Sequence, residues 1–263
     1  PSKDRVRPDC PQFAKCGGCV YRHIAYSAEL EAKQQRVADA VQRIGGFKDI
    51  DIKPINGAEN AGAYRNKAQL PVGSGANGGI TLGFFAKHSH RVIGCDECLL
   101  QPEVFALAMK AFKRWQAASK EDVYDEKTGR GHLRHLFLRQ AHSTGEVMVC
   151  VVVNGNGVHN EPLLVKLLRE NVPGIKGIMV NVNRERTNVI LGSKYRILWG
   201  QDYITDELCG LKFRISSDSF YQVNSSQAER LYTIAKKYAK LTGRETVLDL
   251  YCGTGTIGLT MAK

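Results

Sequence analysis

Three cysteines near the start of the chain place the tightest constraint on its fold. Cys10, Cys16 and Cys19 form the pattern C-x5-C-G-G-C, and a fourth candidate, Cys98 or Cys95, lies far downstream. Three thiolates from one tight loop plus one remote thiolate are a common ligand arrangement of a cuboidal iron–sulfur cluster. The two glycines fit this arrangement, because closely spaced ligands need a backbone that can turn sharply around a bulky cofactor. We therefore expect the first part of the chain to surround a metal centre.

A four-cysteine zinc site is the main alternative. Cys16-x2-Cys19 and Cys95-x2-Cys98 are each a possible half of such a site. Cys10 would then be left over, and the gap from Cys19 to Cys95 is longer than a compact zinc ribbon uses. Spacing therefore favours a [4Fe-4S] cluster over zinc, and by itself it leaves the choice between Cys98 and Cys95 open.

The composition describes an ordinary globular protein with an excess of positive charge. The 263 residues carry a formal net charge of +11, which favours a polyanionic partner, most commonly nucleic acid. The longest apolar run, Val147–Val153, is far too short to span a bilayer, and no signal peptide opens the sequence. We expect a cytoplasmic protein with no membrane contact and with its eight cysteines reduced.

A glycine-rich loop near residue 255 is the second informative motif. Gly253-x-Gly255-x-x-Gly258 matches the dinucleotide-binding fingerprint, which is weak evidence when it stands alone. An acidic residue, Asp249, precedes the glycines inside an apolar segment, and this D-x3-G-x-G spacing favours S-adenosylmethionine over a nicotinamide cofactor. The acidic residue that would bind a ribose is expected about 20 residues further on, beyond residue 263. An ordinary strand-to-helix turn is the plain alternative.

The order of the predicted elements divides the chain into two parts. An α+β pattern dominated by antiparallel hairpins runs to residue 219, and a helix–strand–loop–helix pattern typical of a doubly wound sheet begins at residue 220. Helices are predicted at 27–44, 102–118, 161–171, 224–241 and from 256. Strands are predicted at 64–72, 80–85, 133–141, 147–153, 177–183, 188–191, 212–216 and 246–250.

Taken together, these motifs resemble those of the RNA 5-methyluridine (uracil-C5) methyltransferases of the RumA/TrmA type. The resemblance covers most of the chain, and it is specific only as a combination. It rests on Cys10-x5-Cys16-Gly-Gly-Cys19, Tyr64-Arg65-Asn66-Lys67, Gly83-Phe84-Phe85, Cys98-Leu99-Leu100-Gln101, Asp218-Ser219-Phe220-Tyr221-Gln222-Val223-Asn224 and Asp249-Leu-Tyr251-Cys-Gly253-x-Gly255.

The resemblance implies a fold class and a set of cluster ligands. The fold would be an α+β central domain with an iron–sulfur cluster at 1–219, followed by the truncated start of an α/β Rossmann-like S-adenosylmethionine-dependent methyltransferase domain at 220–263. Residues 29–61 would pack with the catalytic domain. The [4Fe-4S] ligands would be Cys10, Cys16, Cys19 and, because such proteins use a Cys-x-apolar-Gln context, Cys98.

The resemblance also assigns cofactor and RNA residues. Gln222, Tyr251 and Thr256 would contact S-adenosylmethionine, in a loop formed with Asp249, Gly253 and Gly255. Phe220 would lie near the flipped target base, although core packing is the plain alternative for this ring. Arg65, Lys67 and Arg134 are candidates for RNA contacts, and solvated surface charge is the alternative for each.

The family's reaction is an alkylation of uracil. A cysteine thiolate adds to C6, C5 takes the methyl group, and a base removes the C5 proton. The motifs that carry this nucleophile and base do not occur in the sequence, so we expect both beyond residue 263 and the chain by itself to be inactive. The cluster motif points to the 23S ribosomal RNA branch and to a monomer. Alternatives are a transfer-RNA uracil-C5 methyltransferase, a non-enzymatic iron–sulfur RNA-binding module and a nicotinamide-dependent iron–sulfur oxidoreductase.

Overall fold

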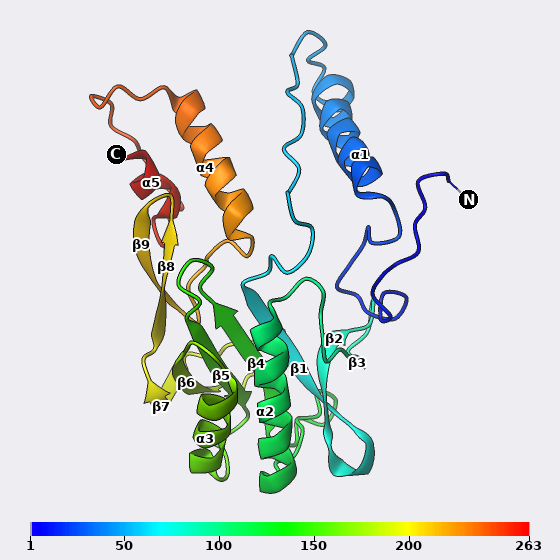
Figure 1. Cartoon of the computed structure of the whole chain (residues 1–263), viewed down its shortest axis with the longest axis vertical. Helices are drawn as coiled ribbons and strands as arrows, with labels where there is room; N and C mark the ends of the chain where they lie inside the picture. Colours follow the sequence, from blue (N-terminus) through cyan, green and yellow to red (C-terminus); the bar gives the residue numbers. More distant parts are fainter. Residues whose placement is uncertain (1, 263) are drawn as a thin grey trace.

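A seven-stranded mixed sheet forms the centre of the molecule in a computed structural model that describes residues 2–262 (Figure 1). Its spatial order is β3-β2-β1-β4-β5-β6-β7. Neighbouring strands are antiparallel except β5 and β6, which run parallel and are therefore joined by a helical crossover, α3. The strands are β1 (Lys67–Ser74), β2 (Ile80–Phe85), β3 (Val92–Gly94), β4 (Leu133–Gln140), β5 (Val147–Val153), β6 (Ile175–Val182) and β7 (Lys194–Gly200), with a short 3-10 turn, Ala76–Gly78, between β1 and β2.

Two helices, α2 (Glu103–Ser119) and α3 (Glu161–Asn171), cover one face of this sheet (Figure 1). Each presents one apolar stripe at helical spacing, which in α2 includes Phe105, Phe112 and Trp115, all fully buried. The central strand β5 is buried along its whole length. A strand covered on both faces is expected to be continuously apolar, and this explains the run of valines.

The other face is covered by a hairpin, β8 (Tyr203–Leu208) and β9 (Leu211–Ser216), and by α4 (Ser225–Ala239). Tyr221, Ala228 and Tyr232 share one buried cluster with sheet residues such as Phe137 and Met148. The chain after residue 220 therefore packs on the same sheet as the chain before it.

Helix α1 (Tyr26–Ala38) extends away from the sheet and continues as a π-helical turn, Asp39–Ile44 (Figure 1). It has no buried residue. The segment that follows it is tied to α4, because Gln227 Nε2 donates to Asn56 O at 3.1 Å and the Arg230 guanidinium donates to Gly57 O at 2.8 Å. A last short helix, α5 (Thr256–Met261), follows the glycine loop. None of the helices within residues 2–262 is long and apolar enough to cross a membrane.

The expected fold class is wrong. Residues 246–250, predicted as the first buried strand of a Rossmann-like sheet, belong to no strand, and Leu248 and Leu250 are 78% and 76% exposed. The elements from residue 220 onward do not start a new sheet and instead close the core of the first. Within residues 2–262, no group of three or more His, Cys, Asp or Glu side chains is arranged to hold a metal ion. The predicted boundary at residue 219 stays a prediction.

Most of the predicted elements form, with two informative exceptions. The hairpin predicted at 133–141 and 147–153 is β4 and β5, and the helices predicted at 161–171 and 224–241 are α3 and α4. The strand predicted at 188–191 does not form, because the Asn183 side chain binds the carbonyl groups of Val189 and Ile190 that a strand would use for pairing. The partner of β6 is instead β7, which the sequence did not predict.

Candidate functional site

Segment 220–225 leads from β9 into α4. A buried arginine, Arg139, binds the turn that precedes this segment. Arg139 is 2% exposed, and its two terminal nitrogens donate to Ser216 O at 2.5 Å and to Ser219 O at 2.9 Å. Burial lowers the pKa of Arg139 to about 10, and the carboxylate of Asp218 partly offsets this effect. The turn in front of the segment is thus fixed, and Phe220 lies outside the core with 69% of its surface exposed.

The second support of this segment is Asn66. Its Nδ2 donates to Gln222 O at 2.8 Å and to Ser225 Oγ at 3.1 Å, and its backbone N–H donates to Val223 O at 2.9 Å. Asn224 then begins α4, with its Oδ1 accepting from the N–H of Gln227 at 3.2 Å, as the sequence predicted for this cap.

The glycine loop lies beside the same segment. Thr254 Oγ1 donates to Phe220 O at 3.3 Å, and the hydroxyls of Tyr232 and Thr256 are hydrogen-bonded at 3.0 Å. Gly253 and Gly255 have φ values of +54° and +77°, in the left-handed region that glycine adopts without strain. The loop conformation therefore favours glycine at both positions.

The structure brings most of the predicted cofactor residues together. Phe220, two residues before Gln222, is hydrogen-bonded to Thr254 in the loop that also carries Gly253, Gly255 and Thr256. Asp249 packs close to Gly258, since a Cβ added at Gly258 would lie 3.7 Å from its Oδ2. Tyr251 is 97% exposed and makes no comparable contact among the described residues.

Five cysteines line one cavity of about 290 Å³ at the edge of the sheet. They are the four predicted cluster ligands, Cys10, Cys16, Cys19 and Cys98, together with Cys95. The cysteine motif lies directly against β2, because the N–H of Gly17 donates to Phe85 O at 3.0 Å and Cys16 forms a β-bridge with Ala86. A Cβ at Gly17 would lie 2.8 Å from Phe85 O, so only glycine fits this close approach. We call this cavity the cysteine pocket.

The charge state of the thiols distinguishes Cys98 from Cys95. The neighbouring Cys95 side chain lowers the pKa of Cys98 to about 6, and Cys98 in turn raises the pKa of Cys95, whose thiol donates to Glu97 O at 3.2 Å. Burial raises the pKa of Cys16 and Cys19, and the nearby Cys98 and Cys10 thiolates raise it further. Cys98 is thus the member of the pair that is more readily a thiolate, which is the form that binds metals.

The three predicted RNA-contacting cations have different surroundings. Arg65 and Lys67 line the cysteine pocket, and the pKa of Lys67 is lowered by burial and by the positive charges of Arg139 and Arg65. Arg134 is 3% exposed, and its guanidinium donates to the carbonyl groups of Asn183 and Glu185. Arg134 is therefore occupied inside the protein and does not present its charge to an RNA.

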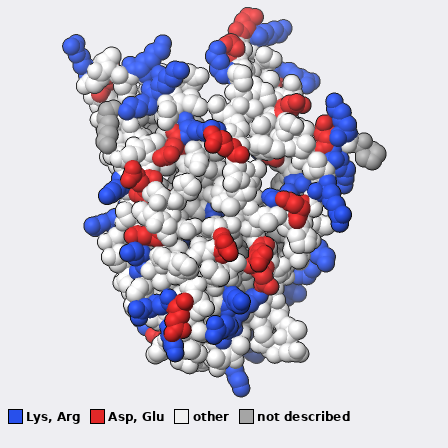
Figure 2. Space-filling view, in the orientation of Figure 1, with Lys and Arg blue, Asp and Glu red and all other residues white. Residues whose placement is uncertain are grey.

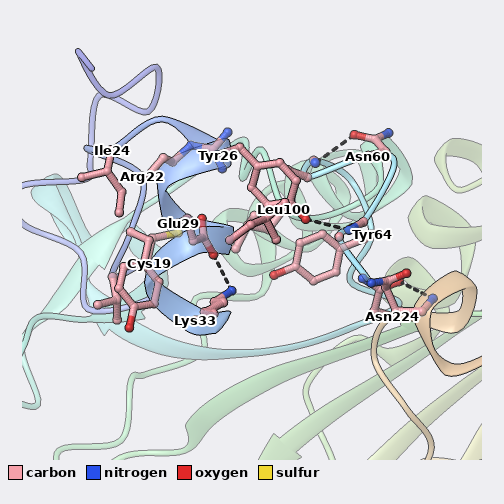
Figure 3. Close-up of a pocket in the computed structure, with 18 of the residues that line it drawn as sticks. Cys19, Arg22, Ile24, Tyr26, Glu29, Lys33, Asn60, Tyr64, Leu100 and Asn224 are labelled. Carbon is pink, nitrogen blue, oxygen red and sulfur yellow. Dashed lines mark hydrogen bonds and ion pairs between the residues drawn. The ribbon is translucent and has the colours of Figure 1, made fainter. Parts of the chain in front are cut away.

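A larger groove of about 900 Å³ separates α1 from the start of α4. Figure 3 shows that its lining comes from three parts of the chain: residues 19–33, residues 60–64 with Leu100, and Asn224. Its walls combine aromatic, amide and charged side chains, among them Tyr26, Tyr64 and the ion pair between Lys33 and Glu29. In the space-filling view the surface is hollowed between the two upper projections, and basic residues surround its rim with acidic ones among them (Figure 2).

Comparison with known proteins identifies the relatives of this chain. No family model matches the sequence. An uncharacterized RNA methyltransferase of Halalkalibacterium halodurans is 43% identical over 262 residues, which are 100% of this chain and 57% of that protein. Another of Staphylococcus epidermidis is 43% identical over 261 residues, 99% of this chain and 57% of that protein. The chain is similar to these RNA methyltransferases over its whole length. It spans a little over half the length of the curated relatives it matches.

A solved structure extends this homology to the fold. The crystal structure of a Pyrococcus abyssi tRNA (uracil-54, C5)-methyltransferase in complex with S-adenosyl-L-homocysteine matches with a TM-score of 0.76 and 27% identity. The match covers 99% of this chain and 57% of that chain. One methyltransferase structure thus matches the fold of nearly the whole chain. This match is the second finding against the expected fold class, and it leaves the predicted domain boundary untested.

Sequence reasoning missed the supporting role of three residues of the site, and it predicted Arg139 only as a candidate RNA contact. Asn66, Arg139 and Thr254 all fix the backbone of segment 220–225 or of the turn before it. Only Asn66 had a sequence signal, because it lies in the Tyr64–Lys67 motif, to which no role could be given.

Proposed function

We propose that the chain belongs to an enzyme that methylates C5 of uracil in RNA with S-adenosylmethionine as the methyl donor. The observation that carries the proposal is the homology to RNA methyltransferases along the whole chain, together with the matched fold of an enzyme that was crystallised with S-adenosyl-L-homocysteine. The cofactor would contact Gln222 and Thr256, with Gly253 and Gly255 allowing the backbone to approach it. Asp249 and Tyr251 complete the proposed cofactor set.

The target base would be taken out of its stack to reach the methyl donor. Phe220 is suited to receive it, because its ring is exposed at the front of segment 220–225 and an aromatic face can stack on an unpaired base. The net charge of +11 supports a polyanionic substrate. Among the described residues we assign neither the nucleophile nor the general base, so the role proposed for this chain is to bind cofactor and RNA.

We further propose that the cysteine pocket holds a [4Fe-4S] cluster on Cys10, Cys16, Cys19 and Cys98. The thiols of residues 2–262 are not arranged as a metal site, so the proposal is supported by two other features of the pocket. The thiols surround a cavity of about 290 Å³, several times the volume of about 30 Å³ that one water occupies in the liquid, whereas zinc requires four sulfurs converging on one point at about 2.3 Å. Arg65 and Lys67 line the cavity, and a cluster with four thiolates is a net anion that would offset their repulsion. Such a cluster would brace the cysteine motif and the loop at Cys98 against the sheet.

The proposed substrate is 23S ribosomal RNA. It rests on the cysteine motif, which the sequence resemblance associates with the ribosomal branch of the family. Transfer RNA is the competing substrate, because the matched solved structure is a tRNA (uracil-54, C5)-methyltransferase.

The test is methyl transfer by the full-length protein from labelled S-adenosylmethionine to 23S ribosomal RNA and to bulk transfer RNA, each isolated from cells that lack the enzyme. We expect 5-methyluridine, identified by mass spectrometry of the digested RNA, to form in the ribosomal RNA only. Label in transfer RNA alone would overturn the choice of substrate, and no label in either RNA would overturn the proposed activity. Anaerobically purified protein should also contain about four irons per chain, and stoichiometric zinc without iron would contradict the cluster.

A further inference from the structure

Asn66 connects distant parts of the chain through four hydrogen bonds. Besides its three bonds to segment 220–225, its carbonyl oxygen accepts from the N–H of Gln140 at the end of β4, at 2.9 Å. Its side-chain partners are 156 and 159 residues away in the sequence, and the residue is 7% exposed. Asn66 therefore joins the sheet to the segment that carries Gln222.

The position of Asn66 is itself fixed from the opposite side. The N–H groups of Ala63 and Arg65 donate to Leu99 O and Leu100 O, each at 2.8 Å. Residues 63–66 thus form a strip between the loop after Cys98 and segment 220–225. The side-chain amide of Asn66 has two N–H donors on a short side chain. It can therefore donate to a carbonyl oxygen and to a hydroxyl oxygen at the same time while the side chain itself is held in place.

We infer that Asn66 is a positioning residue for the cofactor. The inference rests on the proposed role of Gln222 in binding S-adenosylmethionine. Because the carbonyl groups of Gln222 and Val223 are both bound to Asn66, the backbone between them cannot rotate without breaking a buried hydrogen bond. The backbone at Gln222 is therefore already fixed in the cofactor-free protein, so cofactor binding does not have to restrict its conformation. Affinity is gained where such ordering is done in advance.

The inference is tested by replacing Asn66 and a matched buried asparagine in the full-length protein. Asn183 is the control, since it is 2% exposed and its Nδ2 also bridges two backbone acceptors, Val189 O at 2.7 Å and Ile190 O at 2.9 Å. Asn66→Ala and Asn183→Ala should both lower the unfolding temperature. S-adenosyl-L-homocysteine binding is then measured by calorimetry well below both unfolding temperatures.

We expect Asn66→Ala to weaken S-adenosyl-L-homocysteine about tenfold, which corresponds to about 1.4 kcal/mol, and Asn183→Ala to bind as the wild type does. In methyl-transfer assays the KM for S-adenosylmethionine should rise while the KM for RNA stays constant. If Asn66→Ala does not fold, Ser225→Ala removes only one partner of the Asn66 amide and should weaken binding by a smaller factor.

Three results would overturn the inference. Unchanged affinity in both Asn66→Ala and Ser225→Ala would remove the positioning role. Equal weakening in Asn66→Ala and Asn183→Ala would reduce Asn66 to a general stabilising residue. A wild-type protein that does not bind S-adenosyl-L-homocysteine would overturn the proposed function, and this inference with it.

Discussion

The cysteine pocket and the glycine loop are the two most distinctive motifs of the sequence, and they have opposite surroundings. The cysteine motif lies against β2 and lines a cavity, and its cysteines are all partly buried. The glycine loop follows a stretch in which Leu248 and Leu250 are largely exposed, and the exposed fraction of Tyr251 is 97%. Thr254 and Thr256 attach the loop to the remainder of the site.

The contrast teaches how the two proposed ligands would be bound. A pocket supported by a sheet is formed in advance and loses little entropy on binding. A loop with few buried apolar contacts belongs to the least stable part of a structure and gains order from its ligand. We therefore expect substitutions around the cysteine pocket to affect the whole molecule, and substitutions in the loop to affect cofactor binding alone.

The largest difference between the two regions should appear when one cysteine of each is changed. Cys98→Ser should remove essentially all cluster iron, because the serine hydroxyl is a poor substitute for the readily ionised thiol. Cys252→Ser in the exposed loop should leave the iron content unchanged. Iron and sulfide analysis of anaerobically purified proteins measures this, and equal iron in both variants would show that the pocket does not bind the cluster.

A pair of leucines compares the stability of the two regions. Leu82 lies fully buried in β2, the strand that the cysteine motif contacts, and Leu82→Ala should lower the free energy of unfolding by about 2–5 kcal/mol. Leu248→Ala should change it by less than about 0.5 kcal/mol, since this side chain is 78% exposed. Urea unfolding provides the measurement. A similar loss in both variants would mean that Leu248 is covered in solution.

Acid should lower the free energy of unfolding through a histidine of the sheet, His135. Burial, with the charge of Arg134, lowers the pKa of His135 in β4 to about 4, against about 6.5 in the unfolded chain. As the pH falls, His135 is therefore protonated in the unfolded chain before it is protonated in the folded protein. The free energy of unfolding keeps its full value above pH 6.5 and decreases between pH 6.5 and pH 4. The loss amounts to at most about 3 kcal/mol.

His135→Gln should remove this acid-dependent part of the unfolding free energy, measured by urea titrations between pH 7 and pH 4.5. His88→Gln changes an exposed histidine and is the matched control, which should unfold as the wild type does. An unchanged curve for His135→Gln would show that other groups carry the acid sensitivity.

The smallest of these effects is expected within the cysteine motif. Gly17→Ala brings a Cβ within 2.8 Å of Phe85 O and should cost about 1–3 kcal/mol, because the motif must move off β2. The neighbouring Gly18→Ala meets only Cys16 Sγ, at 3.4 Å, and should be tolerated. Thermal unfolding and iron content report both effects. Equal behaviour of the two variants would show that the close approach to β2 is unimportant.

Local patterns predicted the interior of the fold well. The valine run became β5 and the periodic apolar residues became α2 and α3, because each pattern matches a surface that must be buried. Strand β7 was missed because it is a largely exposed strand with polar residues such as Lys194 and Arg196. The predicted strand at 246–250 failed because an apolar run becomes a strand only where a neighbour pairs with it.

The candidate site residues stand in visible sequence motifs and remain a prediction, whereas the residues that support them could not be predicted. Gln222, Gly253, Gly255 and Thr256 belong to motifs whose spacing is visible in the sequence. Asn66 and Arg139 donate to the backbone oxygens of Gln222 and Ser219, which are far away in the sequence. Every residue has a backbone oxygen, so the residue types do not indicate which one is bound. Such supports can be found only once the strands are in place.

The contact between Asn66 and Gln222 has a consequence for the order in which the protein is made. A ribosome must add a further 156 residues after Asn66 before the partner exists. Contacts of such separation are slow to form, because the chain must first close a long loop. The sheet and α2 can assemble while synthesis continues, whereas segment 220–225 can be fixed only late. A nascent chain would therefore form its sheet before Tyr221, Ala228 and Tyr232 complete the second core cluster and before it could bind the proposed cofactor.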